Sequence, residues 1–180
     1  MLERYPDICL ELNLDNGFRN IVDERFDAGV RLGESIDKDM IAVRIGPDWR
    51  MIVVASPDYF ARHPAPRTPQ DLMRHNCMNH RQRSDAGRYA WEFEKDGRKL
   101  KIRVDGQLTF NTSYAMIEAV LRGQGVGFVA EDAVRNHVAA GRLVQVLDDW
   151  CPFFAGYYLY YPSRRQNSAA FNIVLEALRA

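Results

Sequence analysis

The sequence predicts an α/β protein, and three observations support that prediction. Apolar runs of strand length alternate along the whole chain with amphipathic segments that begin at helix-capping residues. The 180 residues are 47% hydrophobic and 27% charged, which is the balance of a globular protein and not of a disordered chain. Neither an internal repeat nor a low-complexity linker interrupts the pattern, so we expect one domain or two small lobes.

The first third of the chain is predicted to contain one helix among four strands. Residues 7–14 alternate, with four apolar side chains on one face, and this pattern favours a strand. The Asp15-Asn16-Gly17 turn then leads into a short amphipathic helix over residues 18–25. Further strands are expected at residues 27–33, 40–45 and 51–55.

Capping and turn residues mark the later elements. Ser56-Pro57-Asp58 and Thr68-Pro69-Gln70-Asp71 each place a capping residue before a proline and an acid, which predicts a helix start. Asp96-Gly97 lies between two alternating runs and predicts a hairpin. Asn111-Thr112-Ser113 caps a helix that stops at Gly123. The remaining predictions are a strand at 126–130, a helix at 132–140, strands at 143–147 and 156–161, and a terminal helix capped by Ser168.

Two places in the chain could carry it from one lobe to another, namely Ser56 and the segment 148–152. If both are crossovers, residues 1–55 and 151–180 form one lobe and residues 56–150 form the other. A ligand cleft between the two lobes would follow.

Charge and cysteine content narrow the function classes. With 24 basic and 24 acidic residues the net charge is zero, which argues against a dedicated nucleic-acid module. The balance is uneven along the chain, because residues 44–103 carry 13 basic and 7 acidic residues. That excess either favours an anionic ligand or belongs to a solvated face. The odd, scattered cysteines Cys9, Cys77 and Cys151, with no secretory signal or membrane span in the sequence, lead us to expect a cytoplasmic protein.

Two motifs suggest a nucleotide or metal site but do not fit either one. Gly123-x-Gly125-x-Gly127 follows a helix and precedes a strand, the reverse of a dinucleotide fingerprint, so a left-handed helix end is expected there. His75-x-Cys77-x-x-His80 lacks a fourth metal ligand nearby, and Cys77 is predicted to be a small buried residue. The sequence contains no catalytic motif. We therefore predict no cofactor, no metal and no enzymatic activity.

Two features fit an anion. The helix start at Asn111-Thr112-Ser113 offers free backbone N–H groups and polar side chains, although plain capping would also explain it. Arg31 ends an apolar strand, where its guanidinium could pair with a ligand carboxylate or form a structural ion pair. We expect a carboxylate to contact Thr112 and Ser113, with Arg31 opposite.

The chain resembles the effector-binding region of LysR-type transcriptional regulators. Seven pieces match in the order of that family and together span nearly the whole chain. They are 26–34 with 39–45, 56–63, 71–77, 123–129, 141–144, 147–150 and 160–164.

The resemblance implies a fold of the periplasmic-binding-protein type II, in which two α/β lobes joined by crossover strands hold an effector in the cleft. It places the effector contacts at positions that match those of the family. These are Asn16, Phe18, Arg31, Ser56, Asn79, Arg81, Asn111, Thr112 and Ser113.

The sequence also departs from the family pattern at its N-terminus. Met1 falls after the winged helix-turn-helix and after the first strand and most of the first helix of the effector region, so we expect an incomplete first lobe. A gap in that sheet would leave unpaired backbone groups, which predicts marginal stability or association with another chain.

The leading hypothesis is therefore an effector-sensing domain with a small-molecule ligand. We expect a homo-oligomer, a dimer or a tetramer, that meets DNA only through a helix-turn-helix absent from this chain and has no membrane partner. A free-standing solute-binding protein of the same fold is the alternative.

Overall fold

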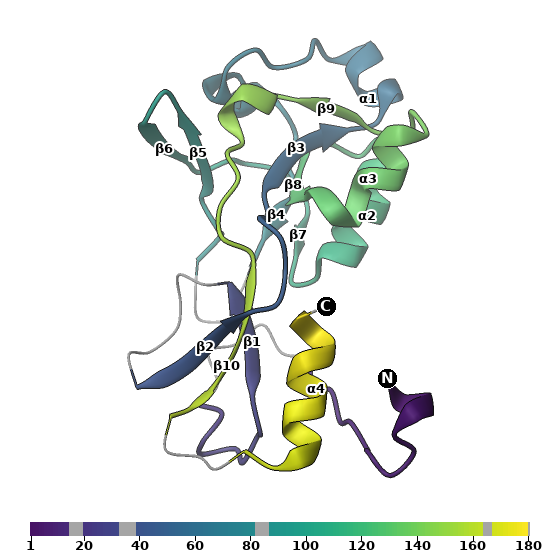
Figure 1. Ribbon diagram of the computed structural model, residues 1–180. Helices are drawn as coiled ribbons and strands as arrows, with labels where there is room; N and C mark the ends of the chain where they lie inside the picture. Colours follow the sequence, from purple (N-terminus) through teal and green to yellow (C-terminus); the bar gives the residue numbers. More distant parts are fainter. Residues whose placement is uncertain (15–19, 33–38, 82–86, 164–166, 180) are drawn as a thin grey trace. The chain divides into compact units, whose positions relative to one another are not determined.

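A computed structural model of the chain describes residues 1–14, 20–32, 39–81, 87–163 and 167–179 (Figure 1). The chain divides into two compact units, residues 1–49 with 154–180 (unit 1) and residues 50–153 (unit 2). The sequence predicts one lobe of residues 1–55 with 151–180, but the structure places residues 50–55, with strand β3 (Met51–Ala55), and residues 151–153 in unit 2. The reason is tertiary, since β3 pairs there with strands on both sides.

Unit 1 is built on a three-stranded antiparallel sheet. Strand β10 (Tyr157–Pro162) is central and pairs with β1 (Gly29–Leu32) and β2 (Met40–Arg44). Helix α4 (Ala169–Arg179) packs Phe171 and Leu175 against Leu159 and Tyr161. As predicted, Ser168 caps this helix, because its hydroxyl accepts a hydrogen bond of 3.1 Å from the Phe171 N–H. The short 3-10 helix η1 (Leu2–Arg4) precedes these elements.

Two predictions in the first 32 residues are wrong. Residues 7–14 form no strand, and Leu12 and Leu14 are 83% and 97% exposed. An alternating pattern makes a strand only where a neighbouring strand supplies hydrogen bonds and cover, and the described residues pair no strand with this segment. Residues 20–26 form turns and no helix, and Arg25 has a left-handed φ of 60°. Residues 15–19 lie outside the described part.

The core of unit 2 surrounds strand β3. This strand lies between β8 (Gly127–Ala130) and β9 (Val144–Val146), and both pairings are antiparallel. Helices α2 (Ser113–Leu121) and α3 (Glu131–Ala139) run along one side of this sheet (Figure 1). Residues 52–55 have no exposed surface, which explains why β3 is a continuous apolar run instead of an alternating one.

The predicted hairpin over β5 (Trp91–Lys95) and β6 (Arg98–Ile102) is confirmed. At its turn, Asp96 and Gly97 have φ of 50° and 74°, the pair of left-handed residues that a tight type I′ turn requires. Trp91 stacks on Phe128 with ring centroids 5.2 Å apart, which attaches the hairpin to the core.

The remaining elements of unit 2 are short. Ser56 caps α1 (Pro57–Arg62) by accepting a hydrogen bond of 3.2 Å from the Tyr59 N–H, as its position before Pro57 predicts. Asp71 accepts from the Thr68 N–H at the start of the 3-10 helix η3 (Pro69–Arg74). The 3-10 helix η4 (Asp148–Trp150) precedes the return to unit 1. Among the described residues, no helix has both the length and the hydropathy that crossing a bilayer requires.

The glycine-rich segment after α2 is a helix end, as predicted. Gly123 has φ of +70° directly after α2, so it is the left-handed residue that ends the helix. Gly125 is required for a second reason, because a Cβ at this position would lie 2.0 Å from the carbonyl oxygen of Asn76. Strand β8 then begins at Gly127.

Gly125→Ala should therefore destabilise unit 2 by about 2 kcal/mol or more, because a backbone oxygen cannot move aside as a flexible side chain can. The measurement is the free energy of unfolding in urea. Gly87→Ala is the matched control, since nothing lies within 4 Å of a Cβ at Gly87. Equal stability of the two variants would contradict this packing.

Arg50 begins unit 2 and binds three separate elements. Its Nη2 donates to Glu131 at the start of α3 over 2.6 Å, and its Nη1 donates to Asp148 over 2.9 Å. Its guanidinium carbon lies 4.6 Å from the ring centroid of Phe153, at the other boundary of the unit. The hydrogen bond with Glu131 raises the pKa of Arg50 and lowers that of Glu131. Arg50 thus fixes both ends of unit 2 to its body.

Arg50→Met should lower the free energy of unfolding by about 2 kcal/mol, because it leaves the half-buried Glu131 carboxylate unpaired. The exposed pair Arg44–Asp48 provides the control. Arg44→Met should change stability by less than about 0.5 kcal/mol. Equal losses of unfolding free energy in both variants would contradict this stabilising role of Arg50.

Candidate functional site

One parallel strand pair places polar residues together in unit 2. Strands β4 (Asn79–His80) and β7 (Thr109–Phe110) run parallel, with Asn79 opposite Thr109 and His80 opposite Phe110. Their carboxyl ends therefore meet at one edge, where the Arg81 N–H donates to the Phe110 carbonyl over 2.8 Å. Ligands of α/β proteins typically bind outside such carboxyl ends. We call this place the β4–β7 end, formed by residues 79–81 and 111–113.

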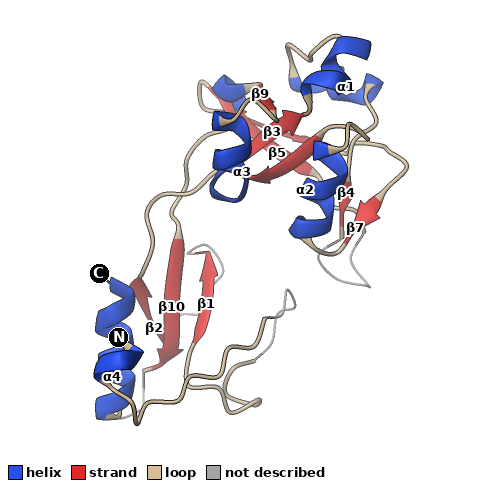
Figure 2. Ribbon diagram, turned by 90° about the vertical axis from the view of Figure 1, so that its right-hand side faces the viewer, coloured by secondary structure: helices blue, strands red, loops and turns tan. Residues whose placement is uncertain are grey.

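Helix α2 begins at the β4–β7 end (Figure 2). The side-chain cap and the acidic residue that commonly complete a helix start are both missing from its first turn. Thr112 is the N-cap residue, but its side chain makes no capping hydrogen bond, and the first turn contains no acidic residue. The other described α-helices differ in this respect. Ser56 caps α1, Ser168 caps α4, and α3 has Glu131 and Asp132 in its first turn. The first turn of α2 therefore presents its N–H groups and partial positive charge to an outside anion.

A buried amide at the same end has an unused acceptor. Asn79 has no exposed surface, and its Nδ2 donates to the Cys77 carbonyl over 3.4 Å. Its Oδ1 has no hydrogen-bond partner among the described residues. The adjacent His80 is half-buried and its Nε2 is likewise unpartnered. Burial lowers the pKa of His80, so its ring is neutral at pH 7. Unused polar atoms of this kind are rare in native cores and mark places where a ligand can complete the hydrogen bonding.

In the motif His75-x-Cys77-x-x-His80, the first two residues contact other parts of the protein. Cys77 is fully buried, as predicted, and burial raises the pKa of its thiol to about 12. His75 Nδ1 lies 3.2 Å from the Tyr59 hydroxyl, which accepts a hydrogen bond from the Asn76 N–H. No group of three His, Cys, Asp or Glu side chains in the described ranges could hold a metal ion.

Four other predicted site residues are not among those that form the β4–β7 end. Ser56 Oγ is 3.2 Å from a Cβ position at Gly123, which follows the far end of α2, about 13 Å from its start at 1.5 Å per residue. Arg31 belongs to unit 1, where its guanidinium carbon lies 5.2 Å from the Tyr160 ring centroid. Asn16 and Phe18 lie outside the described residues. The structure therefore groups Asn79, Arg81, Asn111, Thr112 and Ser113.

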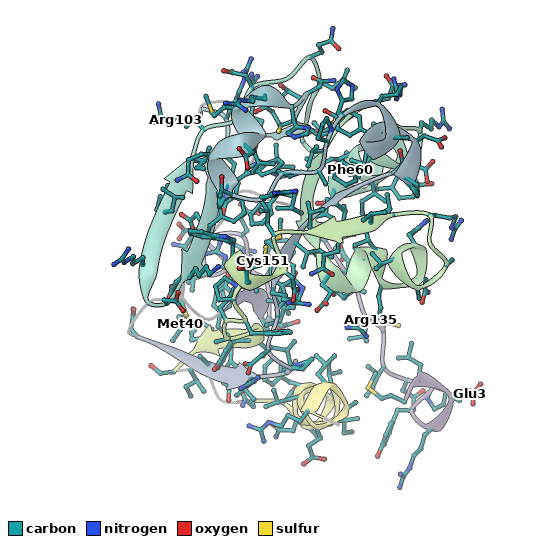
Figure 3. The ribbon with its side chains drawn as sticks, turned by 90° about the horizontal axis from the view of Figure 1, so that it is seen from above. Glu3, Met40, Phe60, Arg103, Arg135 and Cys151 are labelled. Atoms are coloured by element: carbon teal, nitrogen blue, oxygen red, sulfur yellow. The ribbon has the colours of Figure 1, made fainter. Side chains whose placement is uncertain are left out.

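Most of the described basic residues in 44–103 are exposed to solvent. On the hairpin, Lys101 pairs with Glu92, and Lys99 lies 4.0 Å from Glu94. Lys95 pairs with Asp149. Arg103 is exposed and lies at the periphery of the view in Figure 3. Among the basic residues of this segment that the structure describes, Arg81 is the one at the β4–β7 end.

Comparison with known proteins identifies the family. The model of the LysR substrate binding domain matches residues 1–180, so the chain belongs to this family of transcriptional regulator domains. It is 56% identical over 99% of its length to a Pseudomonas aeruginosa protein named as a transcriptional regulator, and covers 58% of that protein. It is 40% identical to the HTH-type transcriptional regulator PgrR of Escherichia coli, covering 99% of this chain and 60% of PgrR. The chain thus spans less than two thirds of these relatives.

Solved structures show the same fold. The regulatory domain of CrgA from Neisseria meningitidis, a LysR-type regulator, superposes with a TM-score of 0.81 at 25% identity, covering 99% of this chain and 86% of that one. Full-length AphB of Vibrio cholerae gives a TM-score of 0.83 at 24% identity, covering 99% of this chain and 59% of that one. The predicted periplasmic-binding-protein type II fold is confirmed. LysR regulators as a family bind small-molecule effectors and work as oligomers.

His80 was considered from the sequence only as a metal ligand, and it is not among the predicted effector contacts. The structure shows that its Nε2 is unpartnered at the same end as Asn79 Oδ1. The signal that could have found it is its place in the sequence, between the two predicted contact residues Asn79 and Arg81.

The half-buried histidines His75 and His80 predict a pH dependence of stability. Burial and the nearby His63 lower the pKa of His75, against the opposing effect of Asp71, and burial lowers that of His80. The folded state thus binds fewer protons than the unfolded state, whose histidines titrate near 6.5. Stability from these groups is fully present above about pH 6.5 and is lost as pH falls through the folded pKa values.

The free energy of unfolding, measured between pH 7.5 and 5, should therefore fall towards acid. His75→Gln and His80→Gln should each make this decline shallower. Because His63 contributes to the lowered pKa of His75, His63→Gln should also make the decline shallower, by less than His75→Gln does. A decline that persists in the His75→Gln, His80→Gln double variant would contradict this assignment.

Proposed function

We propose that this chain senses a small anionic effector, most simply a carboxylate, at the β4–β7 end of unit 2. In this proposal the chain is part of a longer cytoplasmic LysR-type regulator that assembles as a dimer or tetramer and meets DNA through a separate helix-turn-helix domain. The chain itself catalyses no reaction. The named relatives are transcriptional regulators, which favours this function over a free-standing solute-binding protein.

The start of α2 is the single observation that carries the proposal. Its first-turn N–H groups have neither a side-chain cap nor an acidic neighbour, and the exposed Thr112 and Ser113 leave them accessible. Asn79 adds an independent observation, since its unpartnered Oδ1 is fully buried on the adjacent strand. Arg81 adds a positive charge at the same edge.

The chemistry is binding and a shift of population. A carboxylate at the helix start accepts hydrogen bonds from the first-turn N–H groups and interacts favourably with the helix dipole. Its binding favours whichever conformation of the domain presents these groups best, and the DNA-binding part of the full protein responds to that change. Arg31 stays a predicted contact residue from unit 1.

The test uses a variant that supplies the anion from within. Ser113→Glu places a carboxylate in the first turn of α2, so it should stabilise the helix by about 0.3–1 kcal/mol and weaken binding of small carboxylates at least tenfold. Ser113→Gln has the same shape without the charge and should bind within about threefold of the unchanged chain. Affinity is measured by calorimetry or NMR titration with a panel of carboxylic acids.

Opposite changes in stability and affinity separate a binding role from a structural one. If Ser113→Glu binds a panel acid as tightly as Ser113→Gln does, the helix start is not the anion site.

A further inference from the structure

The unpartnered Oδ1 of Asn79 indicates a second chemical group on the ligand, in addition to the anion. Because its Nδ2 is engaged with the Cys77 carbonyl, the orientation of the amide leaves Oδ1 as the atom that needs a donor. A carboxylate cannot fill this role, since its oxygens only accept. The partner that completes Asn79 must bring an O–H or N–H group.

The place of Asn79 in the sheet limits how far that donor is from the anion. Asn79 and Thr109 are opposite each other in the parallel ladder, so their backbones are about 4.8 Å apart. Thr112, the N-cap of α2, follows Thr109 by three residues, a span of at most about 10 Å. One ligand that contacts both Asn79 Oδ1 and the first turn of α2 over this span would have its donor about two to four bonds from its carboxylate.

The surrounding charges favour a neutral donor over an ammonium group. The exposed Arg81 follows β4 directly, and the positive end of α2 begins at the same β4–β7 end. In the described part of the chain, the first acidic side chain of α2 is Glu118, which pairs with Arg122. No carboxylate from α2 therefore compensates a ligand cation at this end.

Resting on the function proposed above, we infer that the effector is a small hydroxy carboxylate. Its carboxylate binds the start of α2 and its hydroxyl donates to Asn79 Oδ1. Asn79 has no exposed surface without ligand, so binding requires the neighbouring side chains to move. Asn79 is in this reading the residue that distinguishes a hydroxy acid from the plain acid and from the amino acid.

The experiment compares acids of one carbon skeleton: butyrate, its 2-hydroxy and 3-hydroxy derivatives, and its 2-amino and 3-amino derivatives. The unchanged chain should bind at least one hydroxy acid about five- to tenfold more tightly than butyrate, as expected for one hydrogen bond to a buried acceptor. The amino acids should bind more weakly than the hydroxy acids. Dissociation constants come from NMR titration, which also reports millimolar binding.

Asn79→Leu tests the residue itself. Leucine is close in size and removes the unused acceptor, so the variant should fold, keep its affinity for butyrate and lose the hydroxyl preference. The side-chain NH2 signals of Asn79, assigned by their absence in this variant, should shift on addition of the preferred hydroxy acid. Asn136→Leu, the same exchange at an exposed position of α3, is the matched control and should retain the preference.

The outcomes separate the two proposals. If no acid of the series binds, the carboxylate site at α2 fails and this inference fails with it. If butyrate binds as tightly as both hydroxy acids, or if the amino acids bind best, only the hydroxyl assignment is overturned. If Asn79→Leu keeps the preference, or if Asn136→Leu removes it as well, the role given to Asn79 is wrong.

Discussion

The pairing of residues 76–81 with both of their neighbours is the constraint on which unit 2 and its candidate site depend. On one side the Met78 N–H donates to the Val126 carbonyl, and on the other the Asn79 N–H donates to the Leu108 carbonyl. Two glycines make this close approach possible. A Cβ at Gly106 would lie 1.9 Å from the Cys77 carbonyl oxygen, and one at Gly125 would lie 2.0 Å from that of Asn76. The segment thus joins β8 to β7 and brings the end of β4 beside the start of α2.

The described α-helices differ in how their starts are completed. A helix start is normally completed by a side chain of its own chain, as Ser56 and Ser168 do here. At α2 the residue types are equally suitable, yet Thr112 makes no such bond. The start of α2 is therefore chemically ready for an anion, while the amide of Asn79 on the adjacent strand lacks a donor. The proposed hydroxy carboxylate would supply an acceptor to the one group and a donor to the other.

The two boundaries of unit 2 are fixed by side chains and not by the secondary structure alone. Arg50 holds Glu131, Asp148 and the Phe153 ring, so the first and last residues of the unit are bound to the same body. In unit 1 the backbones of Trp49 and Phe154 pair with each other, with two hydrogen bonds of 2.9 Å. At both places where the chain passes between the units, a backbone-paired residue of unit 1, Trp49 or Phe154, is therefore directly next to a residue of the Arg50–Phe153 contact in unit 2.

The sequence by itself determined what depends on neighbours along the chain. The caps at Ser56 and Ser168, the Asp96-Gly97 turn and the left-handed Gly123 follow from local backbone preferences, and all four are present. The two-sided burial of β3 follows from its uninterrupted apolar run. The family resemblance pointed to Asn79, Arg81 and the α2 start, which the structure brings together.

Only the tertiary structure decided what depends on partners far away in the sequence. Residues 7–14 have a strand pattern but no paired strand, because hydrogen bonds between strands come from another segment and not from the pattern itself. The place of β3 in unit 2 was set by β8 and β9, which lie more than 70 residues further along. The unmet acceptor of Asn79 is likewise invisible in the sequence. Whether a buried polar atom has a partner is a property of the packed interior, and this atom connects the fold of the chain to the molecule it is proposed to bind.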